Sequence, residues 1–373
     1  MTAPENVLGL DIGGANLKAA TASGWARTIP FALWRQPERL AQQLKELVQQ
    51  FPEPQVLAVT MTGELCDCFP DKASGVRHIL SAVQQVAGRA TVTVWTSDAR
   101  FVSLETLWHQ PKPAASANWL ALAYLAAELL YQHQRGTLSL ANVPPMETFS
   151  SSSAVPPPSQ LRHDWQMLLD LGSTTTDIVP IMDGKPIPQG KTDLQRLEQG
   201  ELIYLGVRRT PLCALLAAVS LAEKEFRPAA EWFADIYDAF LVLDMVPEQP
   251  DLRQTADGRP ATRSWARVRL ARMLCAEPDE LGEADLRQVA HTAVASWERE
   301  WHRVWQLWLQ RFGRPPGVVM LSGEGEWWGR YLLRNSGYQG QTISLGQLLG
   351  PSVSQAACAY AVAKLSLTQQ AHR

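Results

Sequence analysis

The feature of this sequence that most restricts its fold is a short pattern that occurs twice. Residues 7–21 read VLGLDIGGANLKAAT, and residues 167–181 read MLLDLGSTTTDIVPI. In each segment an apolar run leads into an Asp-x-Gly turn with small residues and a second run follows, which is typical of a β-hairpin. The recurrence predicts an internally duplicated architecture.

The chain has 373 residues, which exceeds what one ordinary hydrophobic core accommodates and suits two lobes. Residues 142–164 include a stretch rich in Pro and Ser that has no hydrophobic periodicity, so it predicts a linker or loop. We therefore expect an N-terminal lobe over residues 1–141 and a C-terminal lobe over residues 165–373, the latter with a helical insertion.

Strands alternate with helices along both halves, as in α/β folds. After the first hairpin we expect an apolar strand near 28–34, a helix over 37–50, a strand over 56–60, a helix over 75–86 and a strand over 91–95. After the second hairpin we expect helices over 211–224, 227–243, 264–275 and 286–312, and a strand over 318–321.

Four tryptophans fall on one face of the last of these helices. Trp297, Trp301, Trp305 and Trp308 follow one another at helical spacing. A stripe of this kind is usually part of the core, so we expect these rings to be buried; a ring-stacking ligand site is the alternative.

The charge balance argues against nucleic acid or a membrane surface as a partner. Lys and Arg total 34, Asp and Glu total 37, and the formal net charge is −3.

The most apolar run, residues 119–131, is interrupted by Glu128 and is shorter than the ~20 residues that cross a bilayer. Because the five cysteines are scattered and no signal peptide is evident, we expect a cytoplasmic protein with a small-molecule partner and an undetermined oligomeric state.

The two Asp-x-Gly turns have the chemistry of a phosphate site. Phosphate oxygens are bound by backbone N–H groups where side chains are small, and a metal ion held by carboxylates offsets their charge. A single such turn is more often an ordinary β-turn, but two together favour a clamp in which Asp11 and Asp170 hold Mg²⁺. The residues expected to bind diphosphate or nucleotide are Gly13, Gly14, Asn16, Gly172, Ser173, Thr174 and Thr175, with Ser322, Gly323 and Glu324 from a later glycine-rich turn.

These three motifs, in this order, resemble the superfamily of acetate and sugar kinases, Hsc70 and actin. The resemblance implies an α/β, two-lobed actin-like ATPase fold, with duplicated ribonuclease-H-like cores around a central cleft that holds the ligand. Within the superfamily, the segments 170–177 (DLGSTTTD) and 204–211 (YLGVRRTP) resemble the hydantoinase A/oxoprolinase family.

Several further segments spread over most of the chain carry a closer resemblance. Besides the second hairpin, they are 11–18 (DIGGANLK), 60–69 (TMTGELCDCF), 117–119 (ANW), 206–211 (GVRRTP) and 255–262 (TADGRPAT). Together they resemble the tetrahydromethanopterin-linked one-carbon-transfer group of methanofuran and methylofuran biosynthesis. The resemblance implies an alkyl or aryl transferase that joins a furanylmethyl diphosphate to the phenol of a tyramine- or tyrosine-type acceptor and releases diphosphate.

In such a reaction the phenol has to lose a proton, although its unperturbed pKa is about 10. Glu64 and Asp67 are the candidate bases, because they follow a buried strand at the end expected to face the cleft; a surface turn is the alternative. Lys18 is a third catalytic candidate, which either pairs with phosphate or is a solvated strand lysine. The arginines expected to bind the acceptor carboxylate or the diphosphate, unless they form surface ion pairs, are Arg208, Arg209, Arg259 and Arg263.

Two other classes of function stay open at this point. An ATP-dependent kinase or a hydantoinase/oxoprolinase-like amidohydrolase would use the same clamp on a nucleotide, although residues 322–325 (SGEG) lack the adjacent glycine pair expected beside adenine. A non-catalytic nucleotide-sensing or assembly protein like actin is the other class.

Overall fold

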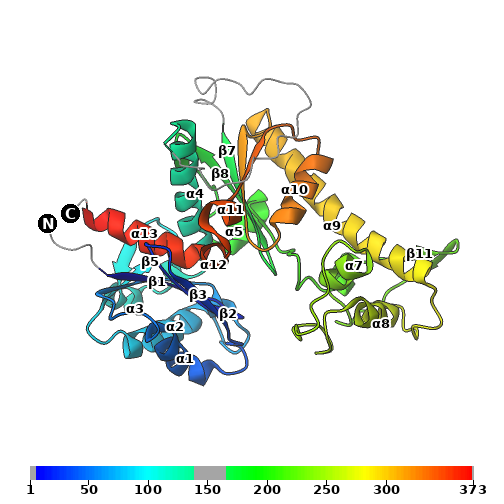
Figure 1. Ribbon diagram of the computed structural model, residues 1–373, viewed down its shortest axis with the longest axis horizontal. Coiled ribbons are helices and arrows are strands. Elements are labelled where there is room, and N and C mark those ends of the chain that lie inside the picture. The colour runs from blue at the N-terminus through cyan, green and yellow to red at the C-terminus, as the bar shows by residue number, and fades with distance from the viewer. Residues whose placement is uncertain (1–5, 138–164, 372–373) are drawn as a thin grey trace.

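The computed structural model describes residues 6–137 and 165–371, so the predicted linker over 142–164 lies outside the described residues. Two mixed β-sheets form the frame of the molecule (Figure 1). Each sheet is built on one of the two hairpins found in the sequence, and a group of helices lies beyond the second sheet.

The first sheet has the spatial strand order β3 (Ala26–Pro30), β2 (Asn16–Thr21), β1 (Val7–Ile12), β4 (Val56–Met61), β5 (Thr91–Trp95), β6 (Phe101–Ser103). β1 pairs antiparallel with β2 across the first Asp-x-Gly turn and parallel with β4. On one face, Leu8, Leu10 and Ile12 share a core with α1 (Leu40–Val48) and α2 (Lys72–Val86). The predicted helices over 37–50 and 75–86 are confirmed to within three residues, the first beginning with a 3₁₀ turn, η1 (Pro37–Arg39).

The second sheet repeats this plan in the order β10 (Leu202–Ile203), β8 (Thr176–Met182), β7 (Gln166–Leu171), β13 (Val318–Ser322), β14 (Gln341–Ser344), with β9 (Lys185–Pro186) paired to β8. β7 pairs antiparallel with β8 across the second Asp-x-Gly turn and parallel with β13. The pairing around β7 is therefore the same as the pairing around β1. The predicted duplication of the strand pattern is confirmed.

Two helices, α4 (Asn118–Gln134) and α13 (Ala357–Ala371), connect the two sheets. One hydrophobic core contains residues of both helices together with Val7 and Trp95 of the first sheet and Leu168 and Met320 of the second. α13 packs directly on β1, β2 and β4 (Figure 1). The remaining short elements are η2 (Gly63–Leu65), α3 (Leu104–His109), η3 (Lys112–Ala114), α5 (Asp193–Gln199), α10 (Glu326–Asn335), α11 (Leu345–Leu349) and α12 (Pro351–Gln355).

The long helix α9 (Glu283–Phe312) carries the tryptophan stripe. Trp297, Trp301 and Trp308 are fully buried and Trp305 is 2% exposed, so the prediction that these rings belong to the core is confirmed. Two of them also fix neighbouring backbone, because Trp297 Nε1 donates to the Gly206 carbonyl and Trp308 Nε1 donates to the Gly200 carbonyl.

The insertion before α9 departs from the predicted helices. The helices predicted over 211–224 and 227–243 are wrong in extent, because α6 covers only Leu212–Leu215 and α7 only Ile236–Val242. α8 (Arg263–Met273) and α9 agree with the prediction. α7 and α8 lie near one end of α9, away from the two sheets (Figure 1).

A small hairpin occupies part of the segment 211–224, which was predicted to be helical. β11 (Val219–Leu221) pairs antiparallel with β12 (Lys224–Phe226). Ala222 and Glu223 form the turn with φ angles of 45° and 64°, the left-handed conformations that a tight hairpin turn requires. Over so short an apolar run, periodicity alone does not distinguish a buried strand from a helix.

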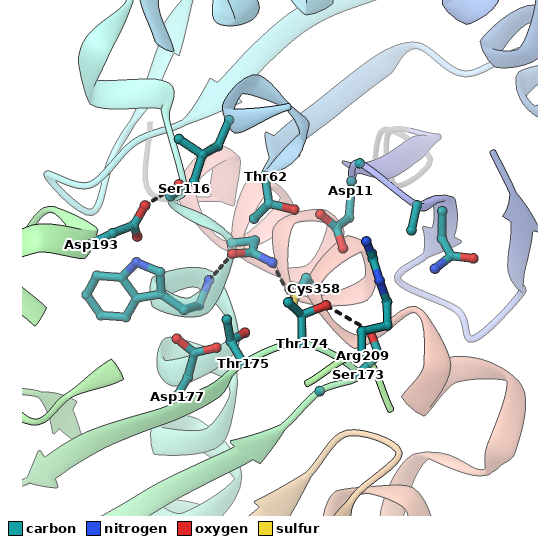
Figure 2. Close-up of a pocket in the computed structure, with 18 of the residues that line it drawn as sticks. Asp11, Thr62, Ser116, Ser173, Thr174, Thr175, Asp177, Asp193, Arg209 and Cys358 are labelled. Carbon is teal, nitrogen blue, oxygen red and sulfur yellow. Dashed lines mark hydrogen bonds between the residues drawn. The ribbon is translucent and has the colours of Figure 1, made fainter. Parts of the chain in front are cut away.

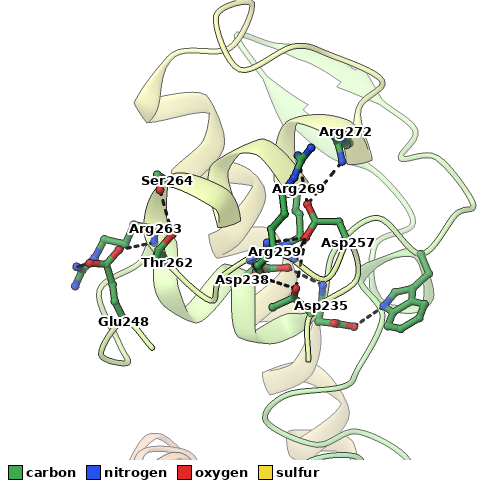
Figure 3. A network of polar contacts seen from close by, with 12 residues as sticks. Asp235, Asp238, Glu248, Asp257, Arg259, Thr262, Arg263, Ser264, Arg269 and Arg272 are labelled. Carbon is green, nitrogen blue, oxygen red and sulfur yellow. Dashed lines mark hydrogen bonds and ion pairs between the residues drawn. The ribbon is translucent and has the colours of Figure 1, made fainter. Parts of the chain in front are cut away.

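A buried ion cluster holds the insertion together (Figure 3). The Arg269 side chain is fully buried and donates to Asp238 Oδ1 through Nε at 2.9 Å and through Nη2 at 2.6 Å. Arg269 Nη1 donates to Asp257 Oδ1 at 3.0 Å. At the N-terminus of α7, the backbone N–H of Asp235 donates to Asp238 Oδ2, and Trp232 Nε1 donates to Asp235 Oδ1. The buried Asp238 and the partly buried Asp257 are therefore both tied to one buried guanidinium.

Replacing Gly9 by Ala is expected to destabilise the protein by roughly 1–3 kcal/mol or more. A Cβ on Gly9 of β1 would lie 1.9 Å from the backbone carbonyl oxygen of Ala359 in α13, and a helix backbone cannot move aside locally. Urea denaturation followed by tryptophan fluorescence measures the change. Gly282→Ala is the control, because its methyl group meets only Asp285 Oδ2 at 3.5 Å; equal midpoints for the two variants would contradict this account.

Asp235→Asn is expected to remove a pH dependence of stability. Burial raises the pKa of Asp235 to about 7, so between pH ~4 and ~7 the folded chain keeps a proton that the unfolded chain has lost, and stability falls as pH rises through this range. Asn also suits a helix N-cap. The free energy of unfolding of D235N, measured by urea denaturation, should therefore rise relative to that of the wild type by about 1–3 kcal/mol from pH 5 to pH 7 and level off above pH 7. A difference independent of pH would show that Asp235 does not titrate there.

Candidate functional site

The turns of the two hairpins line one cavity of about 530 Å³ (Figure 2). The first turn enters from β1 and β2, and the second from β7 and β8. The structure therefore brings the two halves of the predicted clamp together, and the roles of its residues in binding stay predictions. The predicted site residues that line the cavity are Asp11, Gly13, Gly14, Asn16, Lys18, Asp67, Asp170, Gly172, Ser173, Thr174, Thr175 and Arg209.

Backbone hydrogen bonds close both turns in the same way. The N–H of Gly13 donates to the carbonyl of Asn16 at 3.0 Å, and the N–H of Gly172 donates to the carbonyl of Thr175 at 2.9 Å. A Cβ on Gly13 would lie 3.1 Å from the Asn16 carbonyl oxygen, so the glycine allows the tight closure. Such turns place small residues and backbone amides at the cavity wall.

The segment from Gly206 to Thr210 supports the second turn. A Cβ on Gly206 would lie 2.4 Å from backbone atoms of Ser173 and Thr174, and Thr210 Oγ1 accepts the Gly206 N–H at 2.9 Å. The N–H groups of Arg208 and Arg209 both donate to the Ser173 carbonyl. The GVRRTP motif over 206–211 therefore fixes the backbone of the turn.

Asp11 and Lys18 face each other on adjacent strands of the first sheet. Lys18 Nζ lies 3.5 Å from Asp11 Oδ2, and Asp11 Oδ1 is buried with no hydrogen-bond partner among the described residues. Burial raises the pKa of Asp11, and Lys18 only partly offsets this. Burial lowers the pKa of Lys18, but Asp11, Cys358 and Asp170 more than reverse this, so the net direction is upward.

Asp170 is held by the predicted glycine-rich turn. Burial and the nearby Asp177 raise the pKa of Asp170 to about 7, against the hydrogen bond from Ser322 and the charge of Lys18. A Cβ on Gly323 would lie 2.9 Å from Asp170 Oδ1. Ser322 and Gly323 therefore pack behind Asp170 and do not line the cavity. Of the residues predicted to bind diphosphate, Ser322, Gly323 and Glu324 are the ones outside its lining.

Three of the four predicted substrate arginines also lie outside the lining. Arg208 pairs with Glu324 and stacks over the Tyr237 ring. In the insertion, Arg259 lies 3.7 Å from Asp257 and Arg263 pairs with Glu248 and Asp244 (Figure 3). These three arginines therefore form ion pairs within the protein, which was the alternative to substrate binding considered from the sequence.

The carboxylates of the cavity outnumber its cations. Five aspartates line it, against Lys18, Arg196 and Arg209. A phosphate anion entering such a cavity is repelled unless a cation accompanies it. The five aspartates are Asp11, Asp67, Asp170, Asp177 and Asp193.

Sequence reasoning missed several residues of the cavity. Arg196 is 1% exposed, bonds Asp177 at 2.8 Å and lies 3.8 Å above the Trp119 ring. Ser116 and Asp193 come together from segments 77 residues apart. Trp119 lies in the ANW segment that carried the family resemblance, but no local pattern marks Arg196 or Asp193.

Comparisons with known proteins agree with this architecture. Residues 159–315 match the model of the hydantoinase/oxoprolinase family. This region is hydantoinase/oxoprolinase-like. The chain is 28% identical, over 96% of its length and 97% of the relative, to (4-{4-[2-(gamma-L-glutamylamino)ethyl]phenoxymethyl}furan-2-yl)methanamine synthase of Methanocaldococcus jannaschii. A protein of the same name from Methanococcus vannielii is 38% identical over 33% of this chain and 55% of that protein.

Among solved structures, nucleotide-free acetone carboxylase matches 96% of this chain and 70% of its own, with a TM-score of 0.55 and 8% identity. At that identity the likeness concerns the fold alone. The two-lobed, actin-like ATPase fold expected from the motifs is confirmed. In the described part of the chain, no helix combines the length and the apolar character needed to cross a membrane.

Iodoacetamide at pH 8 is expected to alkylate Cys275 well before Cys66. Cys66 lies against the first turn, where a Cβ on Gly14 would be 2.8 Å from its Sγ, whereas Cys275 is exposed. Burial, followed by the charges of Cys68 and Asp67, raises the pKa of Cys66 to about 11. At pH 8 this lowers its thiolate fraction about 100-fold relative to an ordinary cysteine.

Peptide mass spectrometry over time measures this difference, and the denatured chain, in which both thiols react alike, is the control. Equal rates in the native protein would show that Cys66 is not enclosed in this way.

Proposed function

We propose that this chain is a transferase of methanofuran or methylofuran biosynthesis. It condenses a furanylmethyl diphosphate with the phenol of a tyramine- or tyrosine-type acceptor and releases diphosphate. The observation that carries the proposal is that both Asp-x-Gly turns line one cavity, in a chain similar over nearly its whole length to a protein named as a synthase. The name of that relative describes a phenoxymethyl group on a furan, which is the ether such a condensation forms.

The reaction is a displacement at a carbon attached to an electron-rich ring. The C–O bond to diphosphate breaks easily when the leaving negative charge is stabilised, and preorganised donors at that position lower the barrier most. The turns at Gly13–Gly14 and Gly172–Thr175 present small residues and backbone amides to the cavity. In this proposal they bind the oxygens of the departing diphosphate.

A metal ion fits the donor set of the cavity. Asp11 Oδ1 is a buried oxygen without a partner among the described residues, and the cavity has more carboxylates than cations. No group of three or more potential ligands occurs within residues 6–137 and 165–371, which suits Mg²⁺, since it is usually held by one or two carboxylates plus phosphate oxygens. Asp11 and Asp170 would hold it, and when bound it would neutralise the diphosphate charge.

The acceptor has a suitable wall on the same cavity. Trp34 is half-buried, Tyr204 is 54% exposed and Leu65 is 51% exposed, and all three line the cavity. Arg209 lies with its guanidinium carbon 5.4 Å from the centre of the Trp34 ring. The proposal places the phenol ring among these apolar and aromatic groups, with Arg209 available to a carboxylate of the acceptor. The proposal includes a cytoplasmic location, where five unpaired cysteines stay reduced.

Asp11→Asn and Asp170→Asn are each expected to lower ether formation by about 100-fold or more, because each removes one charge from the site that holds the diphosphate and its cation. The assay incubates purified protein with Mg²⁺, furanylmethyl diphosphate and tyramine, and follows diphosphate and ether by mass spectrometry. Circular dichroism checks that both variants fold.

The matched control is Asp183→Asn, an exposed turn residue with φ 51°, a conformation that Asn also tolerates. Rates of D11N and D170N close to that of D183N would show that the aspartates do not act on diphosphate. Turnover of ATP without ether formation by the wild type would overturn the proposed reaction itself.

A further inference from the structure

Glu64, one of the two candidate bases, does not reach the cavity by itself. Its side chain is 1% exposed, and it lies outside the cavity lining, whereas Ser116 belongs to that lining. Ser116 Oγ lies 2.7 Å from Glu64 Oε1. The Ser116 hydroxyl therefore lies between the Glu64 carboxylate and the cavity.

A second carboxylate contacts the same hydroxyl. Ser116 Oγ is 3.0 Å from Asp193 Oδ2 (Figure 2), and Lys72 Nζ donates to that oxygen at 2.7 Å. One hydroxyl hydrogen cannot serve two carboxylates at once. With both carboxyl groups ionised, one of the two contacts lacks a hydrogen; with one added proton, Glu64 donates to Ser116 and Ser116 donates to Asp193, and both contacts are hydrogen-bonded.

The surroundings hold Ser116 in this position at a cost. Ser116 has a φ of 47°, a left-handed conformation that is unfavourable for a residue other than glycine. Gly75 of α2 packs on the other side of Glu64, where a Cβ would lie 2.4 Å from the Glu64 carbonyl oxygen. Backbone strain maintained beside a cavity by surrounding packing is characteristic of functional sites.

We propose that Glu64, Ser116 and Asp193 form a proton relay that deprotonates the acceptor; this rests on the transferase function proposed above. The phenolic proton passes to Ser116 Oγ while the hydrogen that Ser116 held passes to Glu64 Oε1. The phenolic oxygen forms the bond to the furanylmethyl carbon, and the bond from that carbon to diphosphate breaks, its electron pair leaving with the diphosphate. Glu64 later returns its proton to solvent by the reverse path.

Burial, more than any nearby charge, favours uptake of this proton by Glu64. Burial raises the pKa of Glu64 and Asp193 adds to the rise, while the Ser116 hydrogen bond and Lys72 act against it. Lys72 contacts Asp193, so the positive charge neutralises Asp193 more directly than Glu64. Glu64 therefore takes the proton in this relay, and Asp193 orients the hydroxyl through which Glu64 acts.

The test measures ether and furanylmethyl alcohol separately, since water is the competing nucleophile. In Glu64→Gln and Ser116→Ala, ether formation is expected to fall about 100-fold, while diphosphate release with formation of the alcohol persists. With a ring-fluorinated tyramine, whose phenol is more acidic, the loss should shrink to less than about 10-fold, because a more acidic phenol depends less on a base. A structural defect would lower the formation of ether and of alcohol alike, and the size of the loss would not depend on the acidity of the phenol.

Asp98→Asn is the matched control for contact between the two halves. Lys191, two residues before Asp193, donates to Asp98 at 2.8 Å, so this variant removes another ion pair between the two halves of the chain without touching the relay. D98N should keep the wild-type ratio of ether to alcohol. A relay variant that keeps this ratio, or a D98N variant that loses it to the same extent, overturns the relay.

A measurement without substrate separates this proposal from the reaction on which it rests. Infrared difference spectra against pH should show a protonated carboxyl band that is absent in E64Q and appears at higher pH in S116A than in wild type, since Ser116 no longer donates to the ionised Glu64 carboxylate. If the wild type makes no ether but the band behaves in this way, the transferase function fails and the proton-holding cluster stands. If E64Q retains the band, the relay is wrong whatever the reaction.

Discussion

Two acidic side chains, Asp11 and Asp170, lie in the same enclosed space, and this costs folding free energy. Burial raises the pKa of both carboxyl groups, and Lys18 offsets only part of the penalty. A protein under selection for stability alone would replace such groups by apolar ones. A ligand that brings a cation recovers the cost on binding, and through linkage it also stabilises the folded chain. In the proposed function, a diphosphate bound together with a cation would supply the positive charge that the aspartates of the cavity lack.

The alternation of side chains along the central strands explains how the two carboxylates meet. Asp11 has the same parity on β1 as Val7, whose core includes α4 and α13, and Asp170 has the same parity on β7 as Leu168, which belongs to that core as well. Both carboxylates therefore project from the faces that the two sheets turn toward their shared helices. A shift of either strand by one residue would turn its aspartate to the opposite face.

The sequence allowed prediction of what depends on neighbouring residues. Both hairpins, α1, α2 and the buried face of α9 follow from apolar periodicity, turn residues and capping, which act over a few positions. The extents of α6 and α7 do not follow in this way. The β11–β12 hairpin that replaces part of the predicted helix has two turn residues in the left-handed region, and it has no distinctive sequence signal. Arg259 belongs to the family-like segment 255–262 and Arg263 follows directly after it, but both form ion pairs inside the insertion, so similarity of sequence did not indicate distance from the cavity.

The missed residues of the site have a common cause. Ser116 meets Asp193 across 77 residues and Lys72 meets Asp193 across 121. Such contacts arise from the packing of one half of the chain on the other, and nothing near Asp193 or Arg196 marks them in the sequence. Glu64 could be predicted as a site residue because it follows a buried strand, and the first hairpin because two apolar runs flank its glycine turn. The contact between Glu64 and the cavity could not be predicted, because it depends on Ser116, 52 positions away.

The position of Glu64 behind the Ser116 hydroxyl suits a reaction in which the furanylmethyl group becomes electrophilic. When diphosphate leaves, the furanylmethyl carbon accepts electrons from any nucleophile in contact with it, and an exposed carboxylate would form an ester with it. Glu64 lies outside the cavity lining, and the group between Glu64 and the cavity is a serine hydroxyl, a weak nucleophile. Asp193 does line the cavity, but it is ion-paired with Lys72. The relay thus keeps the basicity of a buried carboxylate while it denies that carboxylate access to the reacting carbon.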